Sequence, residues 1–236
     1  MIKLNSLILN GRSSASFPFK VFVEEVPGLA LAQKKDKVYE HDFMNGATKQ
    51  TINAWKSTTL QFVFYLHDAT RADLRTFKAW FKNEGTLVRY DDPDFHINYL
   101  SVEVESSPLD ETYGYEVTAT FMCEPFEYEE EKEITLGAEI NNHTSAPMYP
   151  LIKITGDTAS ETSLSIGSQT MYFKQGVQGT ITVECKHGKQ NVKDSTGRLM
   201  NNQTRGSFFE IPVGKSKVVK GQGITEVKML TRWGWL

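Results

Sequence analysis

Hydrophobic and polar positions alternate along several stretches of the first half of the chain. This period of two is typical of half-buried β-strands, and it predicts strands over residues 19–26, 58–66, 101–106 and 113–123. Residues 1–10 alternate in the same way and are also expected to form a strand. A turn around residues 108–111 is expected to join the last two strands as a hairpin.

One stretch has a helical period instead. Leu74, Phe77, Trp80 and Phe81 recur at spacings of three and four, which predicts a helix with one broad apolar face. We expect Asp68 or Thr70 to cap its start, with Asp73 completing a capping box. We also expect Gly85 to close the helix in the left-handed conformation.

The pattern changes after Cys123, where six glutamates crowd into residues 124–133. Short stretches rich in Thr, Ser and β-branched residues follow, separated by glycines and other turn formers. Their spacing is typical of a β-sandwich. Strands are expected over residues 150–156, 163–167, 170–174, 179–185, 206–212 and 223–230.

These patterns predict a mainly β protein of two modules. Residues 1–130 are expected to form an α+β module with one helix on an antiparallel sheet, and residues 131–236 a β-sandwich. Residues 34–49 are polar and include a turn-forming Asn45-Gly46 pair, so they are expected to form an exposed loop or arm.

Aromatic side chains in unusual places are the candidate interface residues. Tyr39, Phe43 and Trp55 lie in or beside the polar stretch, and they indicate either a subunit interface or a local mini-core. Near the end of the chain, Trp233 and Trp235 with Arg232 favour an anchor at a domain or subunit interface. A platform for a sugar is the alternative.

Composition narrows the classes of function. The chain has 236 residues and a formal net charge of -3, so no global field draws it to nucleic acid or anionic lipid. It has no apolar stretch of about 18 residues, so no membrane span is expected. The two cysteines, Cys123 and Cys185, lie in different modules and are expected to be free, buried thiols, which suits a reducing cytosol.

No set of residues indicates catalysis, a metal or a cofactor. Asp91, Asp92 and Asp94 with His96 could be metal ligands, but Pro93 interrupts the spacing and a plain turn is favoured. Glu103 and Glu105 share one strand face instead of opposing each other across a cleft. Three lysines, at positions 215, 217 and 220, are expected on a solvated hairpin, with pairing to the glutamate-rich run as the alternative.

The order of these pieces resembles the distal tail proteins of long, non-contractile-tailed phages. In the first module the resemblance rests on residues 74–81, on 87–94 and on the strand pair ending at 121–128. In the second module it rests on residues 142–156 and 206–215. It covers nearly the whole chain, and the ordered set is more specific than any of its motifs.

The resemblance implies a hexameric ring and no enzymatic activity. Tail-tube-like N-terminal domains close the ring, and galectin-like sandwiches project outward. The ring joins the tail tube protein to the tail-tip protein, and in many phages the outer domains carry receptor-binding proteins. The implied location is the virion tail, after synthesis in the bacterial cytoplasm. A carbohydrate-binding adhesion module and a related tube or tip component are the alternatives, and no sequence-specific nucleic acid binding is expected.

Overall fold

The structure, a computed structural model, describes residues 5–24, 26–52, 54–109 and 114–236. Its contacts divide the chain into two compact units, Met1–Tyr128 with Leu236 (unit 1) and Glu129–Trp235 (unit 2). The division lies next to the boundary expected at residue 130. Residues 1–4 of the expected N-terminal strand and residues 110–111 of the expected hairpin turn lie outside the described residues, as do residues 112–113.

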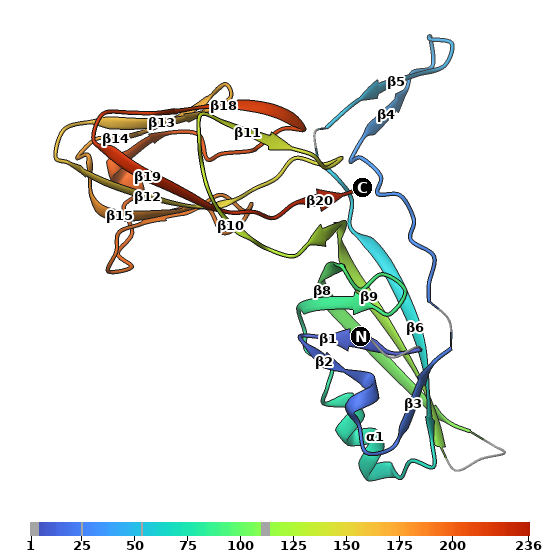
Figure 1. Cartoon of the computed structure of the whole chain (residues 1–236). Helices are drawn as coiled ribbons and strands as arrows, with labels where there is room; N and C mark the ends of the chain where they lie inside the picture. The colour runs from blue at the N-terminus through green and yellow to red at the C-terminus, as the bar shows by residue number, and fades with distance from the viewer. Residues whose placement is uncertain (1–4, 25, 53, 110–113) are drawn as a thin grey trace. The chain divides into compact units, whose positions relative to one another are not determined.

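Unit 1 contains a twisted antiparallel sheet with strand order β2-β1-β7-β8-β9-β6-β3 (Figure 1). The expected strands are present, and β8 and β9 are longer than the patterns indicated. The short 3-10 helix η1 (Ser14–Ser16) leads into β3. The strands are β1 (Leu7–Leu9), β2 (Arg12–Ser13), β3 (Lys20–Val23), β6 (Thr58–His67), β7 (Gly85–Arg89), β8 (Phe95–Pro108) and β9 (Gly114–Glu129).

The helix α1 (Arg71–Lys78) begins as expected and ends early. Thr70 caps it, and its hydroxyl accepts from the Asp73 N–H while the Asp73 carboxylate accepts from the Thr70 N–H. The prediction that Gly85 closes the helix is wrong, because Gly85 is the first residue of β7. A Cβ at Gly85 would lie 2.0 Å from the Asn10 side-chain oxygen, so this position needs glycine for a close approach.

The buried face of the unit 1 sheet carries most of the aromatic core. Phe62 and Phe64 from β6 and Phe121 from β9 are fully buried, and Phe77 from α1 packs on Phe64 in an edge-to-face contact at 5.3 Å. Trp80, which follows the helix, is also buried there. Edge-to-face pairs of this kind add to the burial of apolar area, so the helical stripe predicts the core correctly although Trp80 lies outside the helix.

The expected change of structure at Cys123 comes later than the sequence indicates. Strand β9 continues through Pro125 and ends at Glu129, inside the glutamate-rich run. Pairing of β9 with β6 ends at the Thr58–Cys123 pair, so on that side Pro125 has no ladder hydrogen bond to donate. The proline therefore does not interrupt the strand.

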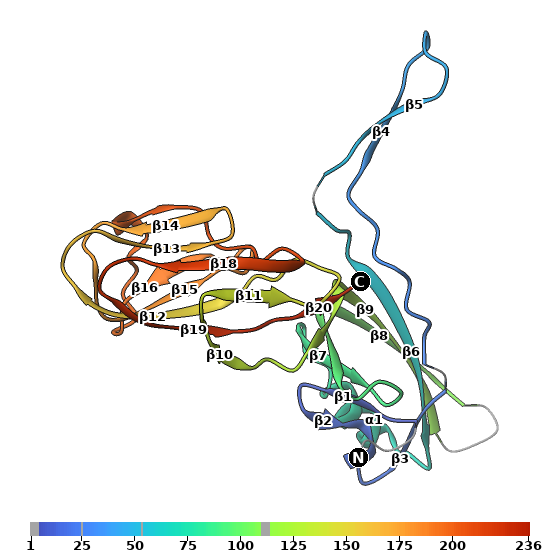
Figure 2. The ribbon, with the colours of Figure 1, turned by 45° about the horizontal axis from the view of Figure 1, so that its top comes forward.

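Unit 2 is a β-sandwich of two five-stranded sheets, of order β10-β19-β12-β15-β16 and β11-β18-β13-β14-β17 (Figures 1 and 2). Their inner faces share one core, in which Ile154 from the first sheet and Leu164 from the second are fully buried. The 3-10 helix η2 (Asn201–Gln203) precedes β17. The strands of these two sheets are β10 (Glu133–Thr135), β11 (Glu139–Asn142), β12 (Leu151–Thr158), β13 (Thr162–Ile166), β14 (Gln169–Phe173), β15 (Val177–Glu184), β16 (Asn191–Lys193), β17 (Thr204–Gly206), β18 (Gly214–Lys220) and β19 (Ile224–Leu230), and the short β20 (Gly234–Trp235) belongs to neither sheet.

Two expectations for unit 2 are wrong in detail. The strand expected over residues 206–212 is only β17, which ends at Gly206, followed by a backbone bridge from Ile211 to Met148. The lysines expected on a solvated hairpin lie on β18, and they do not pair with the glutamate-rich run. Lys215 pairs with Glu139 of β11 at 3.3 Å, and Lys220 donates to the Leu136 carbonyl.

Candidate functional site

The stretch expected to be an exposed loop or arm, residues 34–49, contains a β-hairpin, and this hairpin with its base up to Trp55 is called the arm below. Strands β4 (Lys37–Glu40) and β5 (Ala47–Gln50) pair in register and form a two-stranded sheet of their own (Figure 1). Gly46 has a φ of +87° where the chain turns back, a conformation that suits glycine. Because a two-stranded hairpin is marginally stable in water, its presence needs support from its base.

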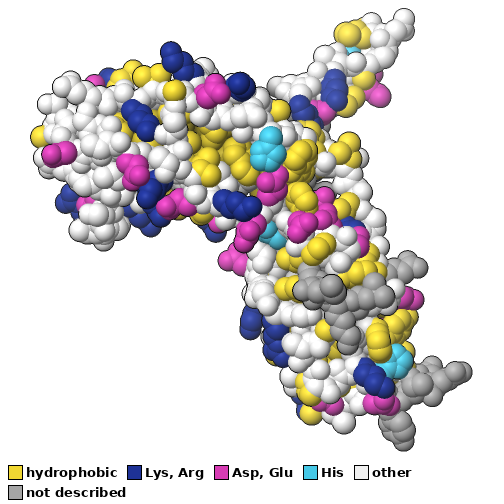
Figure 3. Space-filling model, viewed as in Figure 1, with side chains coloured by type: hydrophobic (Ala, Val, Ile, Leu, Met, Phe, Trp, Pro, Cys, Tyr) yellow, Lys and Arg dark blue, Asp and Glu magenta, His cyan; other side chains and the backbone are white. Residues whose placement is uncertain are grey.

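The free part of the arm exposes apolar side chains. Every residue of β4 and β5 is exposed, and hydrophobic side chains are visible along the arm in Figure 3. Phe43 at the tip is 102% exposed and Tyr39 is 43% exposed. Met44 beside Phe43 is 56% exposed. Neither candidate aromatic residue lies in a mini-core, so for Tyr39 and Phe43 that alternative is wrong.

The base of the arm does have a small local core. The Trp55 ring is half-buried against Phe126 of β9, in an edge-to-face contact at 6.3 Å, and the Lys34 ammonium lies 5.3 Å from its centroid. Lys34 and Trp55 also form a backbone bridge, and Asp36 pairs with Lys49 at 2.5 Å across the hairpin. Trp55 thus packs at the base of the arm in a local mini-core, which was one of the two alternatives for this residue.

Arg232, near the end of the chain, is engaged inside unit 2. Its guanidinium donates to both carboxylate oxygens of Glu184 on β15, at 2.6 and 3.0 Å, and to the Tyr149 carbonyl and Glu131. The side chains of Arg232 and Glu184 are only 19% and 15% exposed. Burial raises the pKa of Glu184, but the bonds from Arg232 and the Lys186 N–H outweigh it, so that pKa lies below its ordinary value.

The two C-terminal tryptophans converge with Glu129 and His143, also inside unit 2. The Trp235 indole N–H donates to a carboxylate oxygen of Glu129 at 2.8 Å, and His143 Nε2 lies 2.8 Å from the same oxygen. The His143 ring meets Trp233 edge-on at 5.2 Å. Burial raises the pKa of Glu129, but the Trp235 and His143 bonds outweigh it, so that pKa is lowered. Trp235 and Trp233 are thus half-buried by groups of their own unit.

Sequence reasoning missed the partners of these C-terminal side chains. Nothing in the glutamate-rich run distinguishes Glu129 and Glu131 from the other glutamates. Nothing in the sequence near Glu184 marks it as a partner of Arg232. His143 is presented by a buried turn, because Asn142 donates to the carbonyls of Ala146 and Ile211. In the sequence, the only signal was the excess of glutamates over residues 124–133, because a half-buried arginine needs carboxylate partners.

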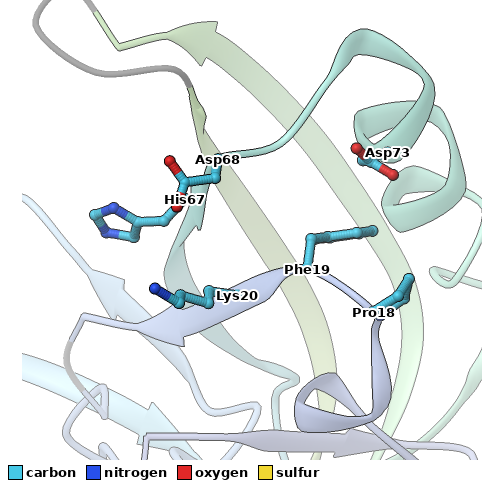
Figure 4. A pocket seen from close by; sticks show the side chains of 6 residues that line it. All are labelled: Pro18, Phe19, Lys20, His67, Asp68 and Asp73. Carbon is cyan, nitrogen blue, oxygen red and sulfur yellow. The ribbon is translucent and has the colours of Figure 1, made fainter.

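A shallow hollow in unit 1 brings four charged or titratable side chains near an aromatic ring, but they do not converge. The Asp73 carboxylate is held in the helix cap, and Figure 4 shows it on the opposite side of the Phe19 ring from His67 and Asp68. The arrangement has no paired acid and base aimed at one point. The lining residues are Pro18, Phe19, Lys20, His67, Asp68 and Asp73.

Three of the acidic candidates from the sequence, Asp91, Glu103 and Glu105, lie in an ion pair or on an exposed strand face. Asp91 pairs with Arg89, and its pKa is lowered chiefly by that hydrogen bond. Glu103 and Glu105 are exposed on β8. Among the described residues, no three His, Cys, Asp or Glu side chains are grouped so as to hold a metal ion. The same residues include no helix that is long and apolar enough to cross a membrane.

Comparison with known proteins gives a result for structure and none for sequence. No family model and no curated protein matches the chain. Among solved structures, the crystal structure of the SPP1 Dit (gp 19.1) protein is similar, with a TM-score of 0.73 and 15% sequence identity. The match covers 99% of this chain and 100% of that one. That protein is described as a paradigm of the hub adsorption apparatus in Gram-positive infecting phages.

The match extends over both units, so it includes the sheet with its helix and the sandwich. At this level of identity the likeness concerns the fold, and it confirms the resemblance found in the ordered sequence motifs. The chain has the fold of the phage distal tail proteins.

Proposed function

We propose that the chain is a structural component of a phage tail tip, a distal tail protein whose six copies form a ring between the tail tube and the tip. The observation that carries the proposal is the match to a hub protein over 99% of this chain. A likeness confined to one unit would point only to a widespread sheet or sandwich, because a fold alone does not give function. Here the match spans both units of this chain and the whole of the other.

Free strand edges in unit 1 support ring formation. Strand β8 pairs with β7 only through Ile97–Tyr99, so on that side residues 101–108 have no partner strand among the described residues. At the other end of the sheet, β3 covers β6 only from Phe64 to His67. Unpaired edges tend to pair with other chains. Two different edges on one subunit suit head-to-tail contacts, which close into a ring.

The arm supports the same arrangement. Its exposed side chains Tyr39, Phe43 and Met44 form an apolar surface on and beside the sheet of β4 and β5, which pairs with no other strand among the described residues. Exposed apolar groups of this kind mark contact sites. The arm is proposed to embrace the neighbouring subunit of the ring. In this arrangement the protein is located in the virion tail, and its partners are the tail tube protein and the tail-tip protein, with receptor-binding proteins on the outer units.

The experiment is the solution mass of the full chain by light scattering over a range of concentrations, with negative-stain microscopy of the same samples. A mass near six chains and a ring in the images are expected. Long stacked tubes would instead favour a tube protein, and one chain at every concentration would count against self-assembly into a ring.

The role of the arm is tested with a matched pair of variants. The double variant Tyr39→Ser, Phe43→Ser is expected to abolish the ring, because it removes the apolar surface from the arm. Leu199→Ser is the control, since Leu199 is 59% exposed in unit 2 and lies outside the arm. Equal assembly of the two variants would show that the arm is not part of the interface. The formation of a ring would still be tested by the solution mass.

A further inference from the structure

The chain contains the dipeptide Asn-Gly twice, and the two asparagine side chains differ in their hydrogen bonds. Asn10-Gly11 follows β1, and Asn45-Gly46 lies at the tip of the arm. Asparagine before glycine is the pair most open to spontaneous deamidation, because no side chain on the glycine shields its backbone nitrogen. Both asparagines are exposed to solvent, so exposure does not distinguish them.

The reaction needs freedom of both side chain and backbone. The Gly nitrogen attacks Cγ of the asparagine, the new N–Cγ bond forms, and the Cγ–Nδ2 bond breaks with release of ammonia, which takes up the proton of the Gly N–H. Water then opens the resulting succinimide at either carbonyl carbon. Opening at the original backbone carbonyl carbon gives isoaspartate, and opening at Cγ gives aspartate.

Asn10 is held on three sides. Its side-chain oxygen accepts from the Thr86 N–H at 2.9 Å, and its amide group donates to the Tyr99 hydroxyl at 3.1 Å. Its own N–H donates to the Thr86 carbonyl at 2.9 Å. The Tyr99 side chain is 1% exposed, so this anchor is itself fixed. Attack by the Gly11 nitrogen would require both side-chain bonds to break.

Asn45 has no such restraint. Within the described part of the chain, no hydrogen bond holds its side chain, and residues 41–46 form the turn between β4 and β5. A Cβ at Gly46 or at Gly11 would have no atom within 4 Å, so crowding at the glycine does not distinguish the two sites and the restraint on the asparagine side chain does. Loop tips of this kind are where backbone freedom concentrates.

We propose that Asn45 is a site of spontaneous deamidation that works as an ageing switch in the arm, while Asn10 is protected by the fold. The change replaces a neutral amide by a carboxylate beside Phe43 and Met44, and isoaspartate also lengthens the backbone of the turn. Burying a new charge in an apolar contact is unfavourable. This consequence rests on the proposed role of the arm in the ring, so aged subunits assemble less well than new ones.

The chemical test is peptide mapping by mass spectrometry after incubation of the full chain in mildly alkaline buffer at physiological temperature. The sample is kept at a concentration at which light scattering gives the mass of one chain. Trypsin places Asn45 in the peptide 38–49 and Asn10 in a peptide that ends at Arg12. Asn45 is expected to react at least about tenfold faster than Asn10, a factor that corresponds to about 1.4 kcal/mol.

Denaturant supplies the internal control. In concentrated urea the hydrogen bonds of Asn10 are lost, and the two sites, which follow the similar residues Leu9 and Met44, are expected to react at nearly equal rates. A ratio that stays high in urea would assign the difference to local sequence and overturn the protection of Asn10. Equal rates in the folded chain would overturn the proposal altogether.

The effect on assembly is read separately. The variant Asn45→Asp is expected to form rings only at a higher protein concentration than the wild type. Asn10→Asp is not used as a control, because it would disturb the contact between β1 and β7. Asn45→Gln, which keeps the amide and reacts more slowly, is expected to retain assembly on ageing. Because the peptide ratio is measured on single chains, an unchanged assembly of Asn45→Asp would reject the role of the arm and leave the modification standing.

Discussion

The arm and the C-terminal segment were equally good candidates for an interface, and the structure separates them. Both carry aromatic side chains in polar surroundings. In the arm, Phe43 is fully exposed and contacts nothing that would hold it. In the C-terminal segment, Trp235 donates to Glu129 and Arg232 is bound by Glu184. An aromatic or arginine side chain is therefore a useful interface signal only when its own chain leaves it without partners.

The largest effect that would sharpen this comparison is at Arg232. Arg232→Met keeps the apolar stem of the side chain but leaves the Glu184 carboxylate poorly solvated and without its cationic partner, so the free energy of unfolding is expected to fall by about 3 kcal/mol. Urea unfolding followed by tryptophan fluorescence measures it. Lys215→Met is the control, because the Lys215–Glu139 pair is exposed and its loss is expected to cost less than about 1 kcal/mol. Similar losses in both variants would show that Arg232 is no internal anchor.

Acid should weaken the same segment. The pKa of Glu184 is lower in the folded chain than its ordinary value of about 4.3. Its stabilising effect is therefore complete above that ordinary value and is lost as the pH falls through the lower, folded value. Urea midpoints measured from neutral pH down into acid are expected to decrease in the wild type. In Arg232→Met this acid-dependent decrease should be smaller, and an unchanged slope would contradict the assignment.

A smaller effect is expected at Trp235. Trp235→Phe removes the N–H that donates to Glu129 and keeps most of the ring, so unfolding should require about 1 kcal/mol less. A double-mutant cycle with Glu129→Ala, which removes the acceptor, measures the coupling, and this should be clearly different from zero. The sugar-platform alternative is checked with one further variant, since glycan binding by the wild type that disappears in Trp233→Ala would assign that function to this segment.

The smallest effect on stability is expected at the tip of the arm. Phe43→Ser should change the free energy of unfolding by no more than about 0.5 kcal/mol, because the side chain contacts nothing in its own chain. The same variant should nevertheless impair assembly. A large loss of stability in a sample of single chains would mean that Phe43 packs within its own chain, and the contrast between the two regions would then fail.

Structural features that depend on neighbouring residues could be predicted from the sequence. Features that depend on residues far apart in the sequence could not. The capping box of Thr70 and Asp73 lies within one turn of chain, and it formed as expected. Gly85 looked like a helix terminator because its real constraint, the side chain of Asn10, comes from a residue far away in the sequence. The lysines of β18 favoured a solvated hairpin, although Ser216 and Val218, which alternate with them, are buried.

The candidate sites follow the same rule. The exposed position of Tyr39 and Phe43 followed from the polar residues around them, which are their own neighbours in sequence. The partners of Arg232 come from positions 131 and 184, and no pattern near the C-terminus points to either. Charged pairs that join distant strands depend on register, and register is decided by the packing of whole sheets.

The two cysteines give each unit its own built-in reporter. Cys123 in unit 1 and Cys185 in unit 2 are free and completely buried, and burial raises the pKa of each thiol to about 12. A thiol that is neither ionised nor accessible does not react with alkylating reagents. Each cysteine becomes reactive only when its own unit opens, so alkylation of the native chain, without any engineered cysteine, reports which unit unfolds first.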